Sequence, residues 1–305
     1  MKKILVIGSV NVDHTTYCET LPKSGETILG KDYQVAVGGK GANQAVACAR
    51  LGGDTTFICG IGNDNDAELV KEELKKYNLK VIYHQFNNVT GKATIIVEEK
   101  NKQNRIIVVS GSNYELKKDI ILKYEHLIKE CDYLLLQLEI PFESVQTSIE
   151  LAYKYHKCII LNPAPAQKLP KNLLSKIDYL TPNESELRVL TGVNVCDEKD
   201  LVKAVNVLLS NGVKNVVVTL GDKGARFFSL KEDLFVEPYK VEAKDTTGAG
   251  DCFNGAFLSH LSLGYKVKEA LDFASASSAL SVTKLGALSA IPNIVEIEKL
   301  KIHND

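Results

Sequence analysis

The chain lacks a long apolar run and lacks an excess of either charge. No apolar segment among its 305 residues approaches the roughly 18 residues that a transmembrane helix needs. Lys2 and Lys3 precede a short apolar run, as in a signal peptide, but polar Asn11 and Asp13 follow without a cleavage-site pattern. Basic residues number 37 and acidic residues 38, which leaves a net charge of −1. We therefore expect no membrane partner and no general nucleic-acid binding.

The cysteines lack any pattern that binds metal or forms a disulfide framework. Seven are scattered along the chain, with no Cys-x-x-Cys and no clustering with histidine. An odd, dispersed set is typical of reduced thiols, so we expect a cytoplasmic protein. Internal repeats, low-complexity tracts and linkers are also absent, and 45% of the residues are apolar. We expect one large domain over residues 1–305, although the length alone also permits two small ones.

Short apolar runs alternate with helical patterns over most of the chain, which predicts an α/β fold. The order predicts a Rossmann-like, doubly wound and mostly parallel sheet with helices on both faces. We expect strands at residues 4–8, 55–59, 81–86, 133–137, 158–161, 179–180 and 216–219, and a hairpin from 225–228 and 234–236. We expect helices at residues 41–51, 64–77, 116–130, 144–154, 184–191, 197–210, 249–263, 266–282 and 294–302.

Two strand-rich segments interrupt this alternation. Residues 14–38 are rich in Thr, Tyr and Val, with a turn near Pro22, and residues 91–109 alternate in the same way. Neither segment fits a strand–helix–strand unit. We therefore expect them to form a small extra sheet that projects from the main domain.

A glycine-rich segment near the C-terminal third combines an anion site with an acid. Gly248, Ala249 and Gly250 stand at the predicted start of a buried helix, where backbone N–H groups lack intrahelical partners and the helix dipole favours anions. Asp251 follows in the first turn. It is either a helix-start acid favoured by the dipole, or a general base beside a site for a developing phosphoryl charge. Phosphoryl transfer needs mainly positioning and charge stabilisation, so such a pair is sufficient for it.

Further polar residues follow the predicted strands, where ligands bind in doubly wound folds. The loop Gly38–Asn43 is either a flexible turn or a close-fitting cradle for a small polar ligand. It is not a P-loop, because none of the Gly-Lys pairs precedes Ser or Thr. The three Gly-x-Gly matches all lack the third glycine of a dinucleotide fingerprint. The polar segments that follow strands are residues 9–13, 137–139, 162–165, 181–184 and 219–224.

Two of these segments resemble the signatures of the ribokinase/PfkB family of carbohydrate kinases. Residues 39–45, with Gly52 and Gly62 downstream, match the first signature, and residues 245–251, with residues 254–256, match the second. The resemblance keeps motif order from residue 4 to about residue 292. Two long signatures in register are highly specific for this family. Residues 9–14, 162–166 and 181–184 also resemble the ribokinases within it.

The resemblance implies a Rossmann-like sheet with a small β-sheet lid, drawn from residues 14–38 and 91–109. It implies that Asp251 is the catalytic base and that Gly248, Ala249 and Gly250 form the anion hole. The implied sugar-binding residues are Asn11, Asp13, Gly39, Lys40, Asn43 and Glu139. The implied nucleotide-binding residues are Asn183, Thr219, Gly221, Asp222, Gly224 and Ser275.

The resemblance also implies two metal sites. Glu186 would lie near Mg²⁺ through water. A monovalent cation, K⁺, would lie among Asp245, Thr247, Ser281, Lys284 and Gly286. Ala290 departs from the family pattern, which often has Ser there, so one side-chain oxygen is missing from this site.

The implied activity is ATP-dependent phosphorylation of D-ribose at the 5-hydroxyl, in a homodimer formed through the lid. The nearest alternative is a sister kinase acting on 2-deoxyribose, another sugar or a nucleoside. A nicotinamide-dependent dehydrogenase is disfavoured because no complete fingerprint exists. A non-catalytic sugar-binding regulator is a third alternative, but it would not need both Asp251 and the anion hole.

Overall fold

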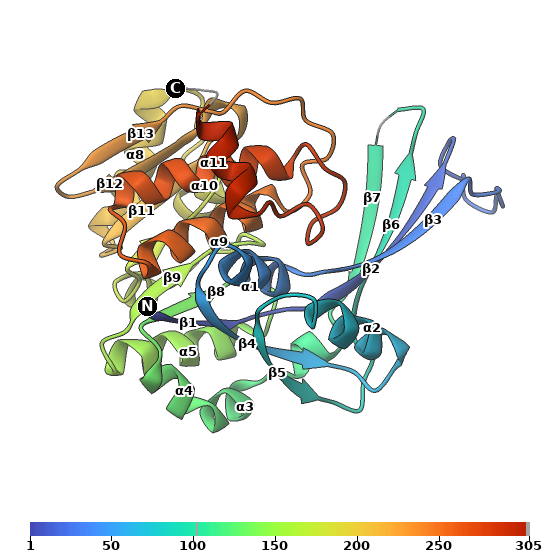
Figure 1. The fold of residues 1–305 in the computed structure, drawn as a ribbon, viewed down its shortest axis with the longest axis horizontal. Coiled ribbons are helices and arrows are strands. Elements are labelled where there is room, and N and C mark those ends of the chain that lie inside the picture. The colour runs from blue at the N-terminus through green and yellow to red at the C-terminus, as the bar shows by residue number, and fades with distance from the viewer. Residues whose placement is uncertain (102, 303–305) are drawn as a thin grey trace.

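The computed structural model describes residues 1–101 and 103–302 and contains a large sheet and a small sheet (Figure 1). The strands of the large sheet are β1 (Lys3–Ile7), β4 (Asp54–Ile61), β5 (Lys80–Gln85), β8 (Tyr133–Leu136), β9 (Cys158–Leu161), β10 (Tyr179–Leu180), β11 (Asn215–Thr219), β12 (Ala225–Ser229) and β13 (Asp233–Val236). Their order is β13-β12-β11-β10-β9-β8-β1-β4-β5. All pairings from β11 to β5 are parallel, and only β12 and β13 pair antiparallel.

Helices cover both faces of the large sheet. Successive residues of a strand point to opposite faces, so each strand packs against helices on both sides. Ile4 and Val6 of β1 pack in one buried cluster, and Leu5 and Ile7 pack in the other. The first face carries α1 (Lys40–Arg50), α2 (Asn65–Leu74), α9 (Ala249–Ser262), α10 (Val267–Ser281) and α11 (Ile294–Ile302). The second carries α3 (Lys118–Lys123), α4 (Glu125–Glu130), α5 (Phe142–Lys154), α6 (Lys171–Leu174), α7 (Glu184–Thr191) and α8 (Glu198–Ser210). The predicted doubly wound architecture is confirmed.

The small sheet projects away from the large one (Figure 1). Its strands are β2 (Asn11–Cys18), β3 (Asp32–Gly38), β6 (Gly91–Glu98) and β7 (Gln103–Val109), in the order β3-β2-β6-β7. Strands β2 and β6 run parallel, and the two outer pairings are antiparallel. Asn11 and Asp13 lie on β2 itself, whereas the sequence predicted that they follow the first strand and that the small sheet begins at residue 14. These two residues therefore belong to the small sheet.

The structure corrects the prediction of one continuous helix over residues 116–130. The helix breaks at Tyr124, which ends α3 and precedes α4 with φ −103° and ψ 12°. The Tyr124 hydroxyl lies 3.2 Å from Nδ1 of His84, and the two rings meet edge to face. This is a tertiary contact with β5, and the helical periodicity of the sequence gives no information about it. The sequence also did not predict α6 or the 3₁₀ helices η1 (Gly111–Glu115) and η2 (Gly221–Lys223).

Helices α1 and α9 pack closely through a glycine. A methyl group at Gly255 would lie 2.3 Å from Cβ of Ala47 and 2.8 Å from the carbonyl oxygen of Gln44. Glycine is therefore required there for the two helices to approach this closely. The approach brings the first turn of α9, with Asp251, beside the residues that open α1.

Candidate functional site

The Asp251 carboxylate is held by two amides from the start of α1. Asn43 donates from Nδ2 to Oδ2 of Asp251 at 2.9 Å, and Gln44 donates from Nε2 to Oδ1 at 2.9 Å. Asp251 is 6% exposed, so this carboxylate is nearly removed from water. Buried carboxylates need such donors, and here both oxygens have one.

A chain of buried amides continues beneath this contact, across the carboxyl ends of β8, β9 and β10. Gln44 Nε2 also donates to Oδ1 of Asn162 at 2.9 Å, and Gln137 Nε2 donates to Oε1 of Gln44 at 2.7 Å. Asn162 Nδ2 donates to the carbonyl oxygen of Thr181 at 3.1 Å. The sequence placed Gln137, Asn162 and Thr181 at strand ends but assigned them no role. It gave no role to Gln44 either, although this residue stands inside the first signature.

The start of α9 leaves space above its first turn. Gly248 caps the helix with φ 75°, in the left-handed region, and a methyl group on it would lie 2.8 Å from Cβ of Ala287. A methyl group at Gly250 would meet no atom within 4 Å. The Ala249 N–H donates to the carbonyl of Thr246 at 3.3 Å, longer than the usual 2.9–3.0 Å. These features fit an anion site. An anion would enter the open space at Gly250 and would replace the long bond of the Ala249 N–H to Thr246.

Lys40 lies among acidic side chains near Asp251. The negative charge of Asp251 raises the pKa of the Lys40 ammonium most strongly, burial opposes this, and Glu139 and Glu186 add to it. Glu139 Oε2 accepts hydrogen bonds from the Lys40 backbone N–H at 3.0 Å and from the Ser9 hydroxyl at 2.5 Å. The predicted residues Lys40, Glu139 and Asp251 are therefore brought together, and Lys40 stays positively charged.

Asp13 has an unusual protonation behaviour. Burial, followed by the nearby charge of Glu139, raises the pKa of the Asp13 carboxyl to about 6, although His14 works in the opposite direction. Gly38 lies close beside it, since a methyl group there would lie 2.5 Å from Oδ2 of Asp13. Asp13 thus faces a confined and acidic environment before any ligand is bound.

Asn11 is oriented by Asn113, a residue that the sequence did not single out. Asn113 accepts from the Val10 N–H at 3.0 Å and donates to the Val10 carbonyl at 3.0 Å and to Oδ1 of Asn11 at 2.8 Å. Val10 joins the large sheet to the small one, so Asn113 fixes this junction. The Nδ2 group of Asn11 remains available as a donor. No sequence signal marks Asn113, because its partners are 102 and 103 residues away.

The glycines of the loop Gly38–Asn43 serve packing within the chain. A methyl group at Gly39, where φ is 92°, would lie 2.9 Å from the Asn11 nitrogen, and one at Gly41 would lie 2.5 Å from the Ser9 nitrogen. The loop therefore lies directly on the strand junction. Within the described residues, buried Oδ1 of Asn43 has no hydrogen-bond partner. A ligand hydroxyl is the kind of donor that would satisfy it.

The predicted nucleotide residues lie at the carboxyl ends of β10 and β11. Asn183 and Thr219 are paired side by side. Asn183 caps α7 by accepting from the Glu186 N–H at 2.8 Å, and Glu186 Oε2 accepts from the Asn183 N–H at 2.9 Å. Gly224 is needed in the following turn, because a methyl group there would lie 2.2 Å from the Val236 carbonyl. This turn, formed by η2, also contains Gly221 and Asp222.

Ser275 lies apart from that turn, on α10. Its hydroxyl is buried and has no partner among residues 1–101 and 103–302. The prediction that Ser275 binds the nucleotide stays a prediction.

A carboxylate joins the two segments predicted to hold a monovalent cation. Asp245 accepts from the Thr247 N–H and hydroxyl at 2.9 and 2.6 Å, and from the Gly286 N–H at 2.9 Å. Burial opposes the effect, but these bonds hold the pKa of the Asp245 carboxyl below its usual value. Lys284 Nζ instead pairs with Glu296 at 2.8 Å, so only its backbone is free to serve a cation. Ser281 donates its hydroxyl to the Ser278 carbonyl at 2.7 Å.

No cluster of three His, Cys, Asp or Glu side chains that could bind a metal occurs in the described part of the chain. Mg²⁺ in phosphoryl-transfer enzymes commonly uses one or two carboxylates and the substrate phosphates. Burial raises the pKa of the Glu186 carboxyl, and the charge of Asp251 adds to this rise. A cation that arrives bound to a nucleotide would stabilise the charged form of this carboxyl group. Across residues 1–101 and 103–302, no helix is long and apolar enough to span a bilayer.

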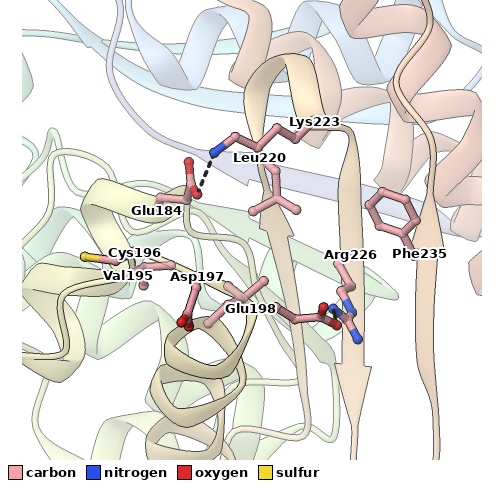
Figure 2. A pocket seen from close by; sticks show the side chains of 10 residues that line it. Glu184, Val195, Cys196, Asp197, Glu198, Leu220, Lys223, Arg226 and Phe235 are labelled. Carbon is pink, nitrogen blue, oxygen red and sulfur yellow. Dashed lines mark hydrogen bonds and ion pairs between the residues drawn. The ribbon is translucent and has the colours of Figure 1, made fainter.

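A cavity of about 470 Å³ lies beside the η2 turn, away from Asp251. Figure 2 shows the ion pair of Glu184 with Lys223 at 3.5 Å, with Leu220 and Phe235 lining the cavity nearby. Arg226 is paired with Glu198 at 2.8 Å on the same wall. The cavity is next to the predicted nucleotide residues of the η2 turn, but none of the predicted catalytic, sugar-binding or nucleotide-binding residues lines it.

Comparison with known proteins gives a consistent result over the whole chain. The model of the pfkB family of carbohydrate kinases matches residues 1–294. The chain is 42% identical over 293 residues to a ribokinase of Haemophilus influenzae, with 95% of each chain covered. It is 35% identical over 299 residues to a deoxyribokinase of Salmonella typhi, with 97% of each covered.

Solved structures of the same kind resemble this fold closely. A ribokinase from Thermotoga maritima superimposes with a TM-score of 0.91 at 40% identity, over 99% of this chain and 100% of the other. Arabidopsis thaliana ribokinase complexed with ribose and ATP gives a TM-score of 0.89 at 32% identity, over 98% of each chain.

Proposed function

The chain belongs to the pfkB family of carbohydrate kinases, and we propose that it transfers the γ-phosphoryl group of ATP to the 5-hydroxyl of D-ribose. One observation carries this proposal beyond family membership. The Asp251 carboxylate, in the first turn of α9, is held by two amides from the start of α1 and lies next to the first-turn N–H groups of α9. A base and an anion site then stand on one helix turn, as transfer to a hydroxyl requires.

In this mechanism Asp251 takes the proton of the 5-hydroxyl, and that oxygen attacks the γ-phosphorus in line with the leaving ADP. Residues 248–250 stabilise the transferring group through their backbone N–H groups. Lys40 balances the negative charge around Asp251. Glu186 would hold Mg²⁺ through water, and that ion would neutralise phosphate charge. The nucleotide would contact Asn183, Thr219, Gly221, Asp222, Gly224 and Ser275.

Sugar recognition falls to residues of β2, of the start of α1 and of the segment that follows β8. Asn43 offers an unpartnered buried Oδ1, and Asn11 has a free Nδ2 donor. Asp13, Gly39, Lys40 and Glu139 complete the proposed sugar site. If Asn11 and Asp13 grip ring hydroxyls, a missing hydroxyl leaves a buried polar group unpaired, which costs roughly 1–3 kcal/mol. We expect ribose to exceed 2-deoxyribose in kcat/KM by at least about tenfold.

A phosphorylation screen over pentoses, hexoses and nucleosides with MgATP tests the proposed substrate. Ribose should give the highest kcat/KM and ribose 5-phosphate should be the product. An equal or reversed preference between ribose and 2-deoxyribose would favour a deoxyribose kinase. The chain is 35% identical to one such enzyme. Turnover only with nucleosides would instead indicate a nucleoside kinase of the same family.

A monovalent cation would act through the Asp245 segment. Asp245 already ties Thr247 to Gly286, immediately before the anion site. K⁺ bound by oxygens of this segment and of Ser281 and Lys284 would stiffen the 248–250 N–H groups. Misplacement by about 1 Å can cost 10²-fold in rate, so we expect several-fold higher activity in KCl than in NaCl. Ala290 is fully buried and lacks a side-chain oxygen, which should weaken the cation affinity without abolishing the effect. Identical rates in both salts at equal ionic strength would make the loop purely structural.

The small sheet would close over the sugar as a lid and exclude water. Its edge strand β7 has all seven residues exposed, including Ile106, Ile107 and Val108 at 53, 66 and 56%. An exposed apolar edge strand favours pairing with another chain, so the lids of two copies would form a homodimer. Sedimentation should report a dimer, and Ile107→Lys should give a monomer. A wild-type monomer at micromolar concentration would refute this part.

The remaining proposals concern the cell and the chain organisation. All seven cysteines are free, which supports a reducing cytoplasm. Residues 1–305 would act as one kinase domain, since the base, the anion site and the sugar site draw on segments from both ends of the chain.

A further inference from the structure

We infer that Gln44 is a positioning residue for phosphoryl transfer, which orients the catalytic carboxylate of Asp251. This inference rests on the proposed function and adds a residue outside the predicted sugar, nucleotide and metal sites. Its basis is the set of hydrogen bonds that Gln44 makes beneath Asp251.

The hydrogen bonds of these amides have only one consistent direction. The Thr181 carbonyl can only accept, so Asn162 must direct its Nδ2 there, at 3.1 Å. Oδ1 of Asn162 then faces Gln44, which must present Nε2 to it at 2.9 Å. The second proton of the same Nε2 points to Oδ1 of Asp251, also at 2.9 Å. A backbone carbonyl therefore sets the direction of the donor that holds Asp251.

All polar atoms of the Gln44 amide are committed within the protein. Gln44 is 0% exposed, and its Oε1 accepts from Gln137 Nε2 at 2.7 Å. Asn43 differs, because its Oδ1 has no partner among the described residues and it belongs to the proposed sugar site. Asn43 is free to change partners when sugar binds, whereas Gln44 is not. Gln44 is therefore the donor that stays on Asp251 through the catalytic cycle.

The same strand end also anchors the anion site. The Thr181 hydroxyl donates to Oδ1 of Asn254 at 2.5 Å, and Asn254 Nδ2 donates to the Gly250 carbonyl at 2.7 Å. Thr181 is 2% exposed and Asn254 is also 2% exposed, so water does not compete for these bonds. The base and the anion site are thus both connected to Thr181, which directly follows β10, and this shared anchor fixes their relative geometry.

Gln44→Met tests this inference, because it keeps the side-chain length and removes both donors. We expect kcat with ribose and MgATP to fall about 30- to 100-fold, since small misplacement of a reacting group costs that order in rate. KM for ribose should change by less than about threefold, because Gln44 does not touch the sugar. Ser148→Ala is the matched control: its buried hydroxyl bonds the Ser144 carbonyl at 2.7 Å on α5. It should leave kcat unchanged, because this hydroxyl bonds only within α5.

A double-mutant cycle with Asn162→Leu separates positioning from general stability. If Asn162 acts through Gln44, the single variant should lose about tenfold in kcat, and the double variant should lose no more than Gln44→Met alone. Additive losses in the cycle, or a Gln44→Met kcat within about twofold of wild type, would overturn the inference. A rise confined to KM for ribose would assign Gln44 to sugar binding and also overturn it. Wild type lacking ribose kinase activity in the same assay would instead refute the proposed function.

Discussion

The carboxyl edge of the large sheet and the small sheet contribute to one site in different ways. At the edge, Asp251 has a donor on each carboxylate oxygen, and Gln44 has every polar atom paired. On the small sheet, Asp13 is confined next to Glu139, and its pKa is raised to about 6. Strand β7 is exposed along its whole length.

This difference indicates which half of the site is ready before substrates bind. A buried side chain whose polar atoms are all paired within the protein, as in Gln44, is stiff, because it loses a bond if it moves. A partly buried carboxylate beside another acid is destabilised, and hydroxyl donors from a bound sugar would stabilise it. The central claim is therefore that the large sheet holds the phosphoryl-transfer geometry in advance, and the small sheet completes the site when sugar binds.

The largest effect should come from the base itself. Asp251→Asn keeps the shape of the side chain and removes the proton acceptor, so kcat should fall by 10²-fold or more, because general-base catalysis is worth about 10²–10⁴. Circular dichroism and Tm should show an intact fold. Near-normal turnover would remove Asp251 from the mechanism and leave it as a helix-start acid.

The next effect concerns the open space above α9. Gly250→Ala should lower kcat about 10- to 100-fold, because a methyl group enters the space intended for the phosphoryl group. Tm should stay the same or rise, since Ala is the better helix former. Gly248→Ala is the contrasting variant and should lower Tm, because Gly248 has φ 75° and faces Ala287. A fully active Gly250→Ala enzyme would show that no anion binds at this turn.

A smaller effect should follow from loosening the junction of the two sheets. Asn113→Leu removes the bonds that fix Val10 and orient Asn11. KM for ribose should rise about tenfold, as one mispaired buried group costs roughly 1–3 kcal/mol. Ser112→Ala is the control, because its hydroxyl bonds Val89 at 2.9 Å, near the same junction, without touching Asn11. Equal changes in KM for both variants would show that Asn113 has no specific role.

The smallest effect is the pH dependence of the small sheet. Below pH 6 Asp13 takes up a proton, so KM for ribose should rise, approaching about tenfold at pH 5, where roughly one-tenth of a carboxyl with this pKa is ionised. Because the folded-state pKa lies above the unfolded value of 3.8, ionised Asp13 destabilises the free enzyme as pH rises through this window.

Asp13→Asn sharpens the same comparison. It should raise Tm of the free enzyme at pH 8, where wild-type Asp13 is ionised, and the difference from wild type should disappear near pH 4. Activity with ribose should fall at the same time. A variant less stable than wild type at pH 8 would show that Asp13 stabilises the free enzyme and would contradict the role given to the small sheet.

Most of the fold follows from periodic patterns in the sequence. Alternating apolar runs and helices predicted the doubly wound sheet, and the two strand-rich segments predicted the small sheet. The break at Tyr124 was not predicted from these patterns, and at the break the Tyr124 hydroxyl contacts His84 of β5, 40 residues away in sequence. Local patterns contain no information about such a distant partner.

The site shows the same division. The signatures identified Asp251 and its glycines, since they are contiguous in sequence. The supporting residues escaped, because Gln44 and Asp251 are 207 positions apart and Asn113 and Asn11 are 102 apart. Their roles depend on which strand ends meet in space. An amide next to a signature asparagine, as Gln44 is, was the one available signal.

The most direct test of the central claim compares crystal structures of the free enzyme and of its complex with ribose and a non-hydrolysable ATP analogue. We expect the 2.9 Å contacts from Gln44 to Asp251 and to Asn162 to be the same in both states, while the small sheet moves toward the sugar. A Gln44–Asp251 contact that forms only in the complex, with the small sheet unmoved, would contradict it.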